Sequence, residues 1–214
     1  MINNTKPFYI YEENNSLFIK NINEKIEKVA NNIVSYCSNF DENNFIHICS
    51  INTKGKLIHF IYKDGRIRRR TLCKVCNNIH NLKNMRLFII QNNLNIFLAE
   101  KSSIKDNYYR VSHYNFSPSN YHIHKYHINN VIENDNYIYR LNIDDMSNMI
   151  FTYDTVDNSE SEFNTKTLIF NYSNKKWMPT NSLLRNSTST SNFKSSTNIK
   201  DDIFEYCYSI NYKT

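Results

Sequence analysis

The chain has 214 residues, of which 40% are hydrophobic and 14% aromatic, so it is too apolar for a disordered protein and long enough for one or two domains. Its formal net charge of +6 is mild for this length and does not require a nucleic-acid partner. An odd number of cysteines, five, argues against a complete disulfide framework. The sequence shows no basic-then-apolar leader and no apolar run of about 18 residues, so we expect a cytoplasmic protein that does not cross a membrane.

One short pattern occurs three times along the chain. It consists of an extended run, a turn rich in Asp and Asn, and an apolar strand, and its copies span residues 40–49, 90–99 and 143–153. Ile46, Ile96 and Ile150 occupy equivalent positions in the copies, 50 and 54 residues apart. A repeat of this length that is made of strands and turns is typical of β-propeller blades.

The N-terminal part predicts strands at residues 8–12, 16–21 and 25–33, which match the second, third and fourth strands of a blade without a first one. Residues 23–32 also allow an amphipathic helix, with Ile26, Val29 and Ala30 on one side, but the repeat favours a strand.

Three complete four-strand units follow. The first is expected at 33–40, 45–51, 56–63 and 66–75, with a hairpin turn at Asp64 and Gly65. The second and third are expected at 86–90, 94–101, 108–116 and 121–131, then at 137–143, 149–155, 164–172 and 176–184. A bulky aromatic recurs before the last turn, as Tyr62, Phe116 and Tyr172. The predicted fold is therefore an all-β propeller of about four four-stranded antiparallel blades within residues 1–184.

The C-terminal part divides into a Ser/Thr/Asn-rich linker at 185–198 and a strand within residues 199–214. Residues 203–211 resemble residues 33–41, the first strand of a unit. One interpretation is that this strand completes the first blade and closes a four-bladed ring, which would remove exposed sheet edges. The alternative is that the chain stops inside a fifth blade and is a fragment of a larger ring.

Residues 41–48, 60–65 and 172–177 carry a family resemblance, because they combine the Asp-x-x-Asn turn, the aromatic before a tight turn and a Trp or basic strand. In these features the chain resembles uncharacterised propeller-repeat proteins of low-GC Firmicutes, clostridia in particular. The resemblance covers about residues 8–184 and implies a propeller fold, but no activity, cofactor or catalytic residue. The chain departs from that pattern by lacking Trp in most blades and by having fewer than the six or more blades expected of such proteins.

Cys73 and Cys76, followed by His80, form the densest group of metal-binding residue types. A Cys-x-x-Cys pair can hold two positions of a zinc ion, but a closed site needs four ligands and no second pair is present. We therefore interpret the cysteines as thiols at the end of an outer strand, with a structural metal or a redox pair as the alternatives. No bound metal or cofactor is expected.

Two other groups of residues have a simple structural interpretation. His122, His124 and His127 are expected to alternate on a strand, with His122 and His124 on one face, as half-exposed histidines. The acidic residues Asp41, Asp144 and Asp145 are expected to form turns rather than to bind calcium.

The densest basic run lies on a predicted outer strand and comprises Lys63, Arg66, Arg68, Arg69, Arg70 and Lys74. Strand alternation predicts that Arg66, Arg68 and Arg70 point the same way. A basic outer strand prevents edge-to-edge pairing, and it could also contact a polyanion through Arg66, Arg68, Arg69 and Arg70.

The sequence contains no nucleophile motif and no glycine-rich phosphate loop, since only two glycines occur. We therefore expect a non-enzymatic binding module whose partner is a protein of unknown identity, with nucleic acid disfavoured. The alternatives are a glycan-binding or glycan-active protein that uses the central funnel of a propeller, and a truncated fragment without a function of its own.

Overall fold

A computed structural model describes residues 8–180, apart from residues 22, 104, 135–136 and 157–162. Its named elements are antiparallel strands and one short 3-10 helix, η1 (Ile79–Asn81), so the all-β class is confirmed. In the described residues no helix is long and apolar enough to span a membrane. The predicted linker and C-terminal strand lie outside the described residues.

The strands form four consecutive meanders. The first is a three-stranded sheet, as expected: β1 (Tyr9–Glu13), β2 (Ser16–Lys20) and β3 (Ile26–Asn31). The second is a four-stranded sheet: β4 (Ile33–Phe40), β5 (Ile46–Asn52), β6 (Lys56–Lys63) and β7 (Arg66–Lys74). The third is β8 (Leu82–Ile90), β9 (Asn93–Lys101), β10 (Tyr108–Phe116) and β11 (His124–Ile132). The fourth is β12 (Arg140–Ile143), β13 (Met149–Val156), β14 (Phe163–Asn171) and β15 (Lys176–Pro179).

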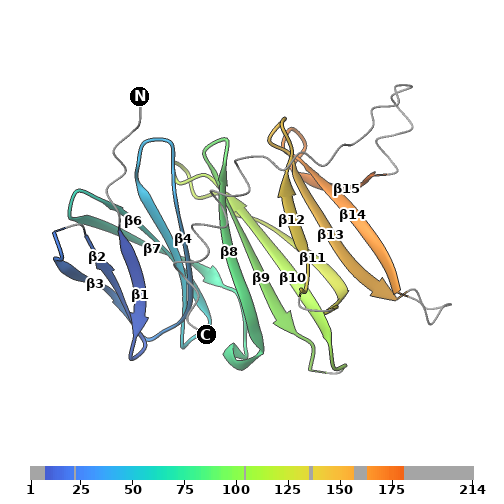
Figure 1. The fold of residues 1–214 in the computed structure, drawn as a ribbon, viewed down its shortest axis with the longest axis horizontal. Helices are drawn as coiled ribbons and strands as arrows, with labels where there is room; N and C mark the ends of the chain where they lie inside the picture. Colours follow the sequence, from blue (N-terminus) through green and yellow to red (C-terminus); the bar gives the residue numbers. More distant parts are fainter. Residues whose placement is uncertain (1–7, 22, 104, 135–136, 157–162, 181–214) are drawn as a thin grey trace.

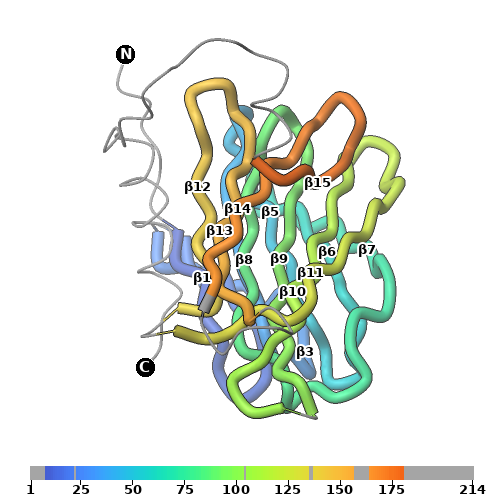
Figure 2. Tube along the Cα trace, turned by 90° about the vertical axis from the view of Figure 1, so that its right-hand side faces the viewer, coloured from blue at the N-terminus to red at the C-terminus, as the bar shows by residue number. Residues whose placement is uncertain are grey.

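The third and fourth meanders are joined by a single residue pair, Ile132 with Asp154, and so count as one eight-stranded sheet by hydrogen bonding. Figure 1 shows the meanders side by side in a row, with β1–β3 at one end and β12–β15 at the other. Figure 2 shows β7 and β11, the last strands of their meanders, toward one side of the molecule, and β12 toward the opposite side. The described sheets form an open row and are not closed into a ring.

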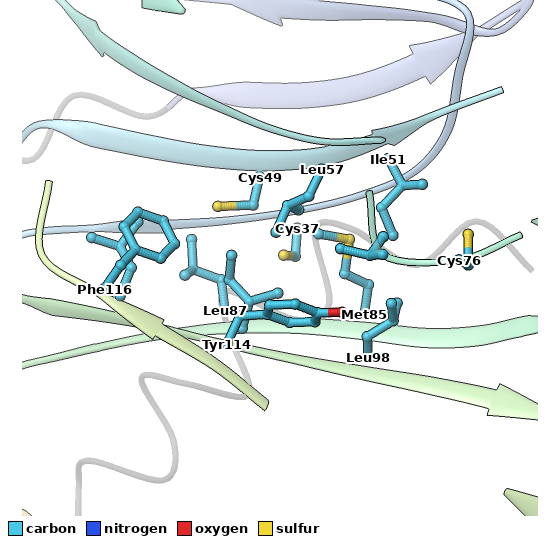
Figure 3. Packing of buried hydrophobic residues seen from close by; sticks show 13 residues of the cluster. Cys37, Cys49, Ile51, Leu57, Cys76, Met85, Leu87, Leu98, Tyr114 and Phe116 are labelled. Carbon is cyan, nitrogen blue, oxygen red and sulfur yellow. The ribbon is translucent and has the colours of Figure 1, made fainter. Parts of the chain in front are cut away.

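Each meander packs a face against the next one, and three apolar clusters fill the spaces between them. In the middle cluster, Cys37, Cys49, Ile51 and Leu57 from β4–β6 meet side chains from β8–β10 (Figure 3). These partners are Met85, Leu87, Leu98, Tyr114 and Phe116. Both faces of the inner sheets are thus buried, and β5 and β9 are accordingly buried at almost every position.

Asx turns explain how the chain makes tight connections with so few glycines. The Asp41 Oδ1 atom accepts the backbone N–H groups of Asn43 and Phe45, at 2.9 and 2.8 Å. The same pattern recurs at the turns that begin at Asn21, Asn52 and Asp144. At the fourth position the backbone is left-handed, as at Asn44 with φ 60°, a conformation that Asn tolerates well. The predicted turn-forming role of Asp41 and Asp144 is confirmed.

Three predicted strand starts are wrong. β8 begins at Leu82, four residues before the expected residue 86, and the extra residues pair with β9 through a register shift between Leu82 and Asn84. The fourth strand of the third meander begins at His124 and not at residue 121, because Tyr121 has a left-handed backbone with φ 56° that interrupts the extended run. β12 begins at Arg140 and not at residue 137, because Tyr137 instead forms an isolated bridge with Asn134.

The recurring aromatic of the fourth meander also differs from the prediction. Tyr62 and Phe116 pair with the first apolar residues of β5 and β9, and the equivalent pair in the fourth meander is Phe170 with Met149. Phe170 is fully buried between meanders, whereas Tyr172 follows the end of β14. Phe170 is therefore the third member of this series.

Candidate anion-binding groove

The basic run lies on β7, and its side chains divide between the two faces of the sheet. Arg66, Arg68 and Arg70 pair with Lys63, Ile61 and His59 of β6, which places the three arginines on the face directed toward the third meander. This part of the prediction is confirmed. Arg69 pairs with Phe60 and lies on the opposite face, so it does not join the other three.

A groove of about 640 Å³ opens between the end of β6–β7 and the loop that connects β10 to β11. Its lining comprises Asp41, Phe45, His47, Ile61, Lys63, Asp64, Arg66, Arg68, Pro118 and Ser119. Lys63 lies over the Phe45 ring, with its Nζ atom 3.9 Å from the ring centroid. The groove thus combines exposed cations with an apolar floor.

The cations that line this groove are Lys63, Arg66 and Arg68. Among the described residues no carboxylate forms an ion pair with Lys63, Arg66 or Arg68, although Asp41 and Asp64 also line the groove. Asp41 directs one oxygen into its own turn and the other toward His47. Like charges that are close together repel one another, and an anionic ligand would relieve that repulsion.

A series of hydrogen-bonded side chains connects the β4–β7 side of the groove to the loop between β10 and β11. The His47 Nε2 atom is 3.4 Å from Asp41 Oδ2, and its Nδ1 atom is 3.0 Å from His59 Nε2. The His59 Nδ1 atom is in turn 3.1 Å from the Tyr121 Oη atom. Since a carboxylate only accepts, one consistent arrangement has Tyr121 donating to His59, His59 donating to His47, and His47 donating to Asp41.

In this arrangement both imidazoles are neutral. Burial, and to a smaller extent the neighbouring His47, lower the pKa of His59 to about 3. Burial also lowers the pKa of His47, and the hydrogen bond and charge of Asp41 oppose that shift only in part. Both rings are buried, at 2% and 1% exposure, so they act as a neutral strut at neutral pH.

Tyr121 holds the second wall of the groove. The guanidinium of Arg70 lies 4.4 Å from the centroid of its ring, and the ring also stacks on Phe116. A left-handed backbone is unusual for an aromatic residue, so the contacts of its side chain must offset the strain. Pro118 and Ser119 precede Tyr121 in the same loop and are thereby held opposite β7.

The same arrangement occurs one meander later. His113 lies three residues before Phe116, just as His59 lies three residues before Tyr62. Its ring packs edge-on against Phe170 and accepts a hydrogen bond from Trp177 Nε1 at 3.1 Å. The sequence analysis did not single out either histidine. Their shared position relative to the recurring aromatic is the signal that could have identified them.

A second groove, of about 420 Å³, lies where β11 meets β14 and β15. Tyr126, Tyr153 and Trp177 contribute to its lining, together with Lys176 and Asn129. Its aromatic lining is of the kind that suits a sugar ring. The groove lies between two meanders, whereas the glycan alternative placed its site in a central funnel.

The predicted metal candidates do not form a cluster. Cys73 is half-buried on β7, Cys76 is buried just after it, and His80 is exposed in η1. Burial raises the pKa of both thiols. No group of three or more His, Cys, Asp or Glu side chains that could hold a metal ion occurs in the part of the chain that the structure describes.

The three clustered histidines serve different local contacts. His122 is exposed in the loop and lies edge-on to His124, so these two rings are together as predicted, although His122 precedes the strand. The His124 Nε2 atom is 3.2 Å from Lys175 Nζ, and the His127 Nδ1 atom is 3.0 Å from Ser112 Oγ.

Comparison with known proteins adds no relative: no protein-family model matches the chain, and no curated protein matches it. The functional argument therefore depends on the geometry of the molecule.

Proposed function

We propose that this chain is a non-enzymatic binding module, and that the groove beside β7 binds an acidic segment of a protein partner. The observation that carries the proposal is the set of three cations, Lys63, Arg66 and Arg68, which line one groove without an acidic partner among the described residues. Arginine favours carboxylate recognition, because its planar group donates two parallel hydrogen bonds. The mild net charge favours a local acidic contact over a long polyanion such as nucleic acid.

The scaffold proposed for this module is a propeller. Four meanders of similar strand order, each packed face to face on the next, support this proposal. A four-bladed ring closed by residues 203–211 and an arc of a larger ring both remain proposals. In either case rigid sheets present the loop of residues 117–121 and the edge of β7 to a partner.

The buried histidines support a binding role rather than a catalytic one. Both nitrogens of His47 are engaged, by Asp41 and by His59, and the ring is almost completely buried. A general base needs an accessible nitrogen within reach of its substrate. The strut instead fixes the separation of the two walls of the groove.

Charge reversal of the groove should abolish this binding. In the triple variant Lys63→Glu, Arg66→Glu, Arg68→Glu, we expect the affinity for a fluorescent Glu-rich peptide to fall at least about a hundredfold, because attraction becomes repulsion. Fluorescence anisotropy at low and at physiological salt measures the change, and the wild-type affinity should fall as salt rises.

A matched variant separates the groove from net charge. Lys54→Glu, Lys56→Glu, Lys83→Glu reverses the same number of exposed cations at positions outside the groove lining. This control should retain most of the affinity. Equal losses in the two variants would show that the peptide responds to overall charge and that the groove is not its site.

A further inference from the structure

β7 has a free edge. In the strand order β4-β5-β6-β7 it pairs with β6, and within the described residues no strand pairs with its other side. The register with β6 shifts between Leu57 and Ile58, which leaves Leu72 as an extra residue, so the regular edge covers Arg66–Thr71. Along this edge the backbone N–H and C=O groups of every second residue point away from β6 and can pair with one more strand.

The arginines on β7 are spaced to match alternate side chains of a strand that pairs with this edge. Arg66, Arg68 and Arg70 are two residues apart on the groove face, which corresponds to about 6.6–6.8 Å between successive arginines. A strand that is added to the edge would place its own alternate side chains opposite them, with Cβ atoms about 4.5–5.5 Å apart. The groove beside β7 is lined by Arg66 and Arg68 and bounded on its far side by Pro118 and Ser119, so it leaves room for the side chains opposite these two arginines.

We infer that β7 captures its partner by β-strand addition: an extended segment with acidic residues at alternate positions pairs antiparallel with Arg66–Thr71, and its carboxylates face Arg66, Arg68 and Arg70. This inference rests on the proposed function and adds the conformation and sequence pattern of the ligand. Main-chain hydrogen bonds to the edge supply affinity, and the alternating charges supply specificity.

Protection against edge-to-edge pairing does not by itself explain the three arginines on one face of β7. One inward charge or a bulge is enough to discourage pairing between edges, and β7 has its bulge at Leu72. Three arginines in register on one face, none of them in an ion pair with a described acid, repel a neutral or basic strand and select an acidic one. The same charges thus exclude a second copy of β7 and admit the proposed ligand.

Peptides test the inference directly on the full chain. The first alternates Glu and Thr, and the second has the same composition with its Glu residues consecutive. Two further peptides keep the alternating sequence but carry N-methyl groups, on the Glu residues in one and on the Thr residues in the other. Since only one of these two sets can donate to β7, we expect one methylated peptide to lose binding by at least about tenfold and the other to retain it. The alternating peptide should bind about tenfold more tightly than the block peptide.

Two variants of the same strand serve as the protein-side test. Arg68→Glu lies on the groove face and should weaken the alternating peptide at least about tenfold, whereas Arg69→Glu has the same charge change on the opposite face and should have a much smaller effect. If all four peptides bind with one affinity, strand addition is wrong while groove binding stands. If no acidic peptide binds, the proposed function itself is overturned.

Discussion

Between pH 5.5 and pH 4 the free energy of unfolding should fall by at least roughly 2.5 kcal/mol per pH unit, because His59 and His113 are buried in the neutral form. Burial lowers the pKa of each to about 3, and an unfolded histidine has a pKa of about 6.5. Below about pH 5.5 the unfolded chain therefore binds nearly two more protons at these histidines than the folded chain does. This stability is fully present above pH 6.5 and is lost as the pH falls toward 3. Urea unfolding at several pH values measures the slope.

Replacement of one buried histidine identifies the source of this slope. His113→Gln keeps an acceptor for Trp177 but cannot titrate, so the slope should decrease by about 1.4 kcal/mol per pH unit. An unchanged slope in His113→Gln would contradict the assignment of a neutral buried imidazole.

Phe97→Ala should lower the free energy of unfolding by about 3–5 kcal/mol, the largest single effect that we expect. The Phe97 side chain is fully buried between the third and fourth meanders. Its ring stacks on His113 with centroids 4.5 Å apart and also contacts Phe151 and Trp177, each at 6.1 Å. Removing the ring leaves a cavity that the rigid sheets cannot fill. Urea or thermal unfolding at pH 7 measures the loss.

Phe18 provides the comparison for this variant. It lies half-buried on β2, where it stacks on Tyr11 at the end of the row, so Phe18→Ala should cost about 1 kcal/mol. Comparable losses at Phe97 and Phe18 would contradict the packing of the fourth meander on the third. Neither variant changes a residue of the groove, so the affinity for acidic peptide should remain that of the wild type.

The sequence predicted the strands well because alternation and turn residues act locally. The strands at 33–40, 56–63 and 108–116 coincide with β4, β6 and β10. The errors come from long-range effects. Tyr121 adopts a left-handed backbone that its own sequence does not suggest, and the contacts with His59 and Arg70, distant in sequence, accompany it. The register between β13 and β14 places Phe170, and not Tyr172, at the position equivalent to Tyr62 and Phe116. Register depends on the pairing of strands and cannot be derived from one strand alone.

The candidate site was predictable in part. A period of two is enough to place Arg66, Arg68 and Arg70 on one face, and the structure agrees. The same period places Arg69 on the opposite face, so the predicted polyanion site should not have included it with the other three arginines. Local sequence could not indicate the opposite wall of the groove, because His59 and Tyr121, whose contact positions that wall, are 62 residues apart.

Amide NMR of the isotope-labelled full chain, titrated with the alternating Glu-Thr peptide, tests most directly whether the edge of β7 is the binding site. The binding proposal predicts shifts concentrated in residues 63–71 and in the loop at 117–121, which faces β7 across the groove. It also predicts that these shifts are lost in the Lys63→Glu, Arg66→Glu, Arg68→Glu variant. Shifts that instead follow other exposed lysines, such as Lys54 and Lys83, or their persistence in the triple variant, would contradict it.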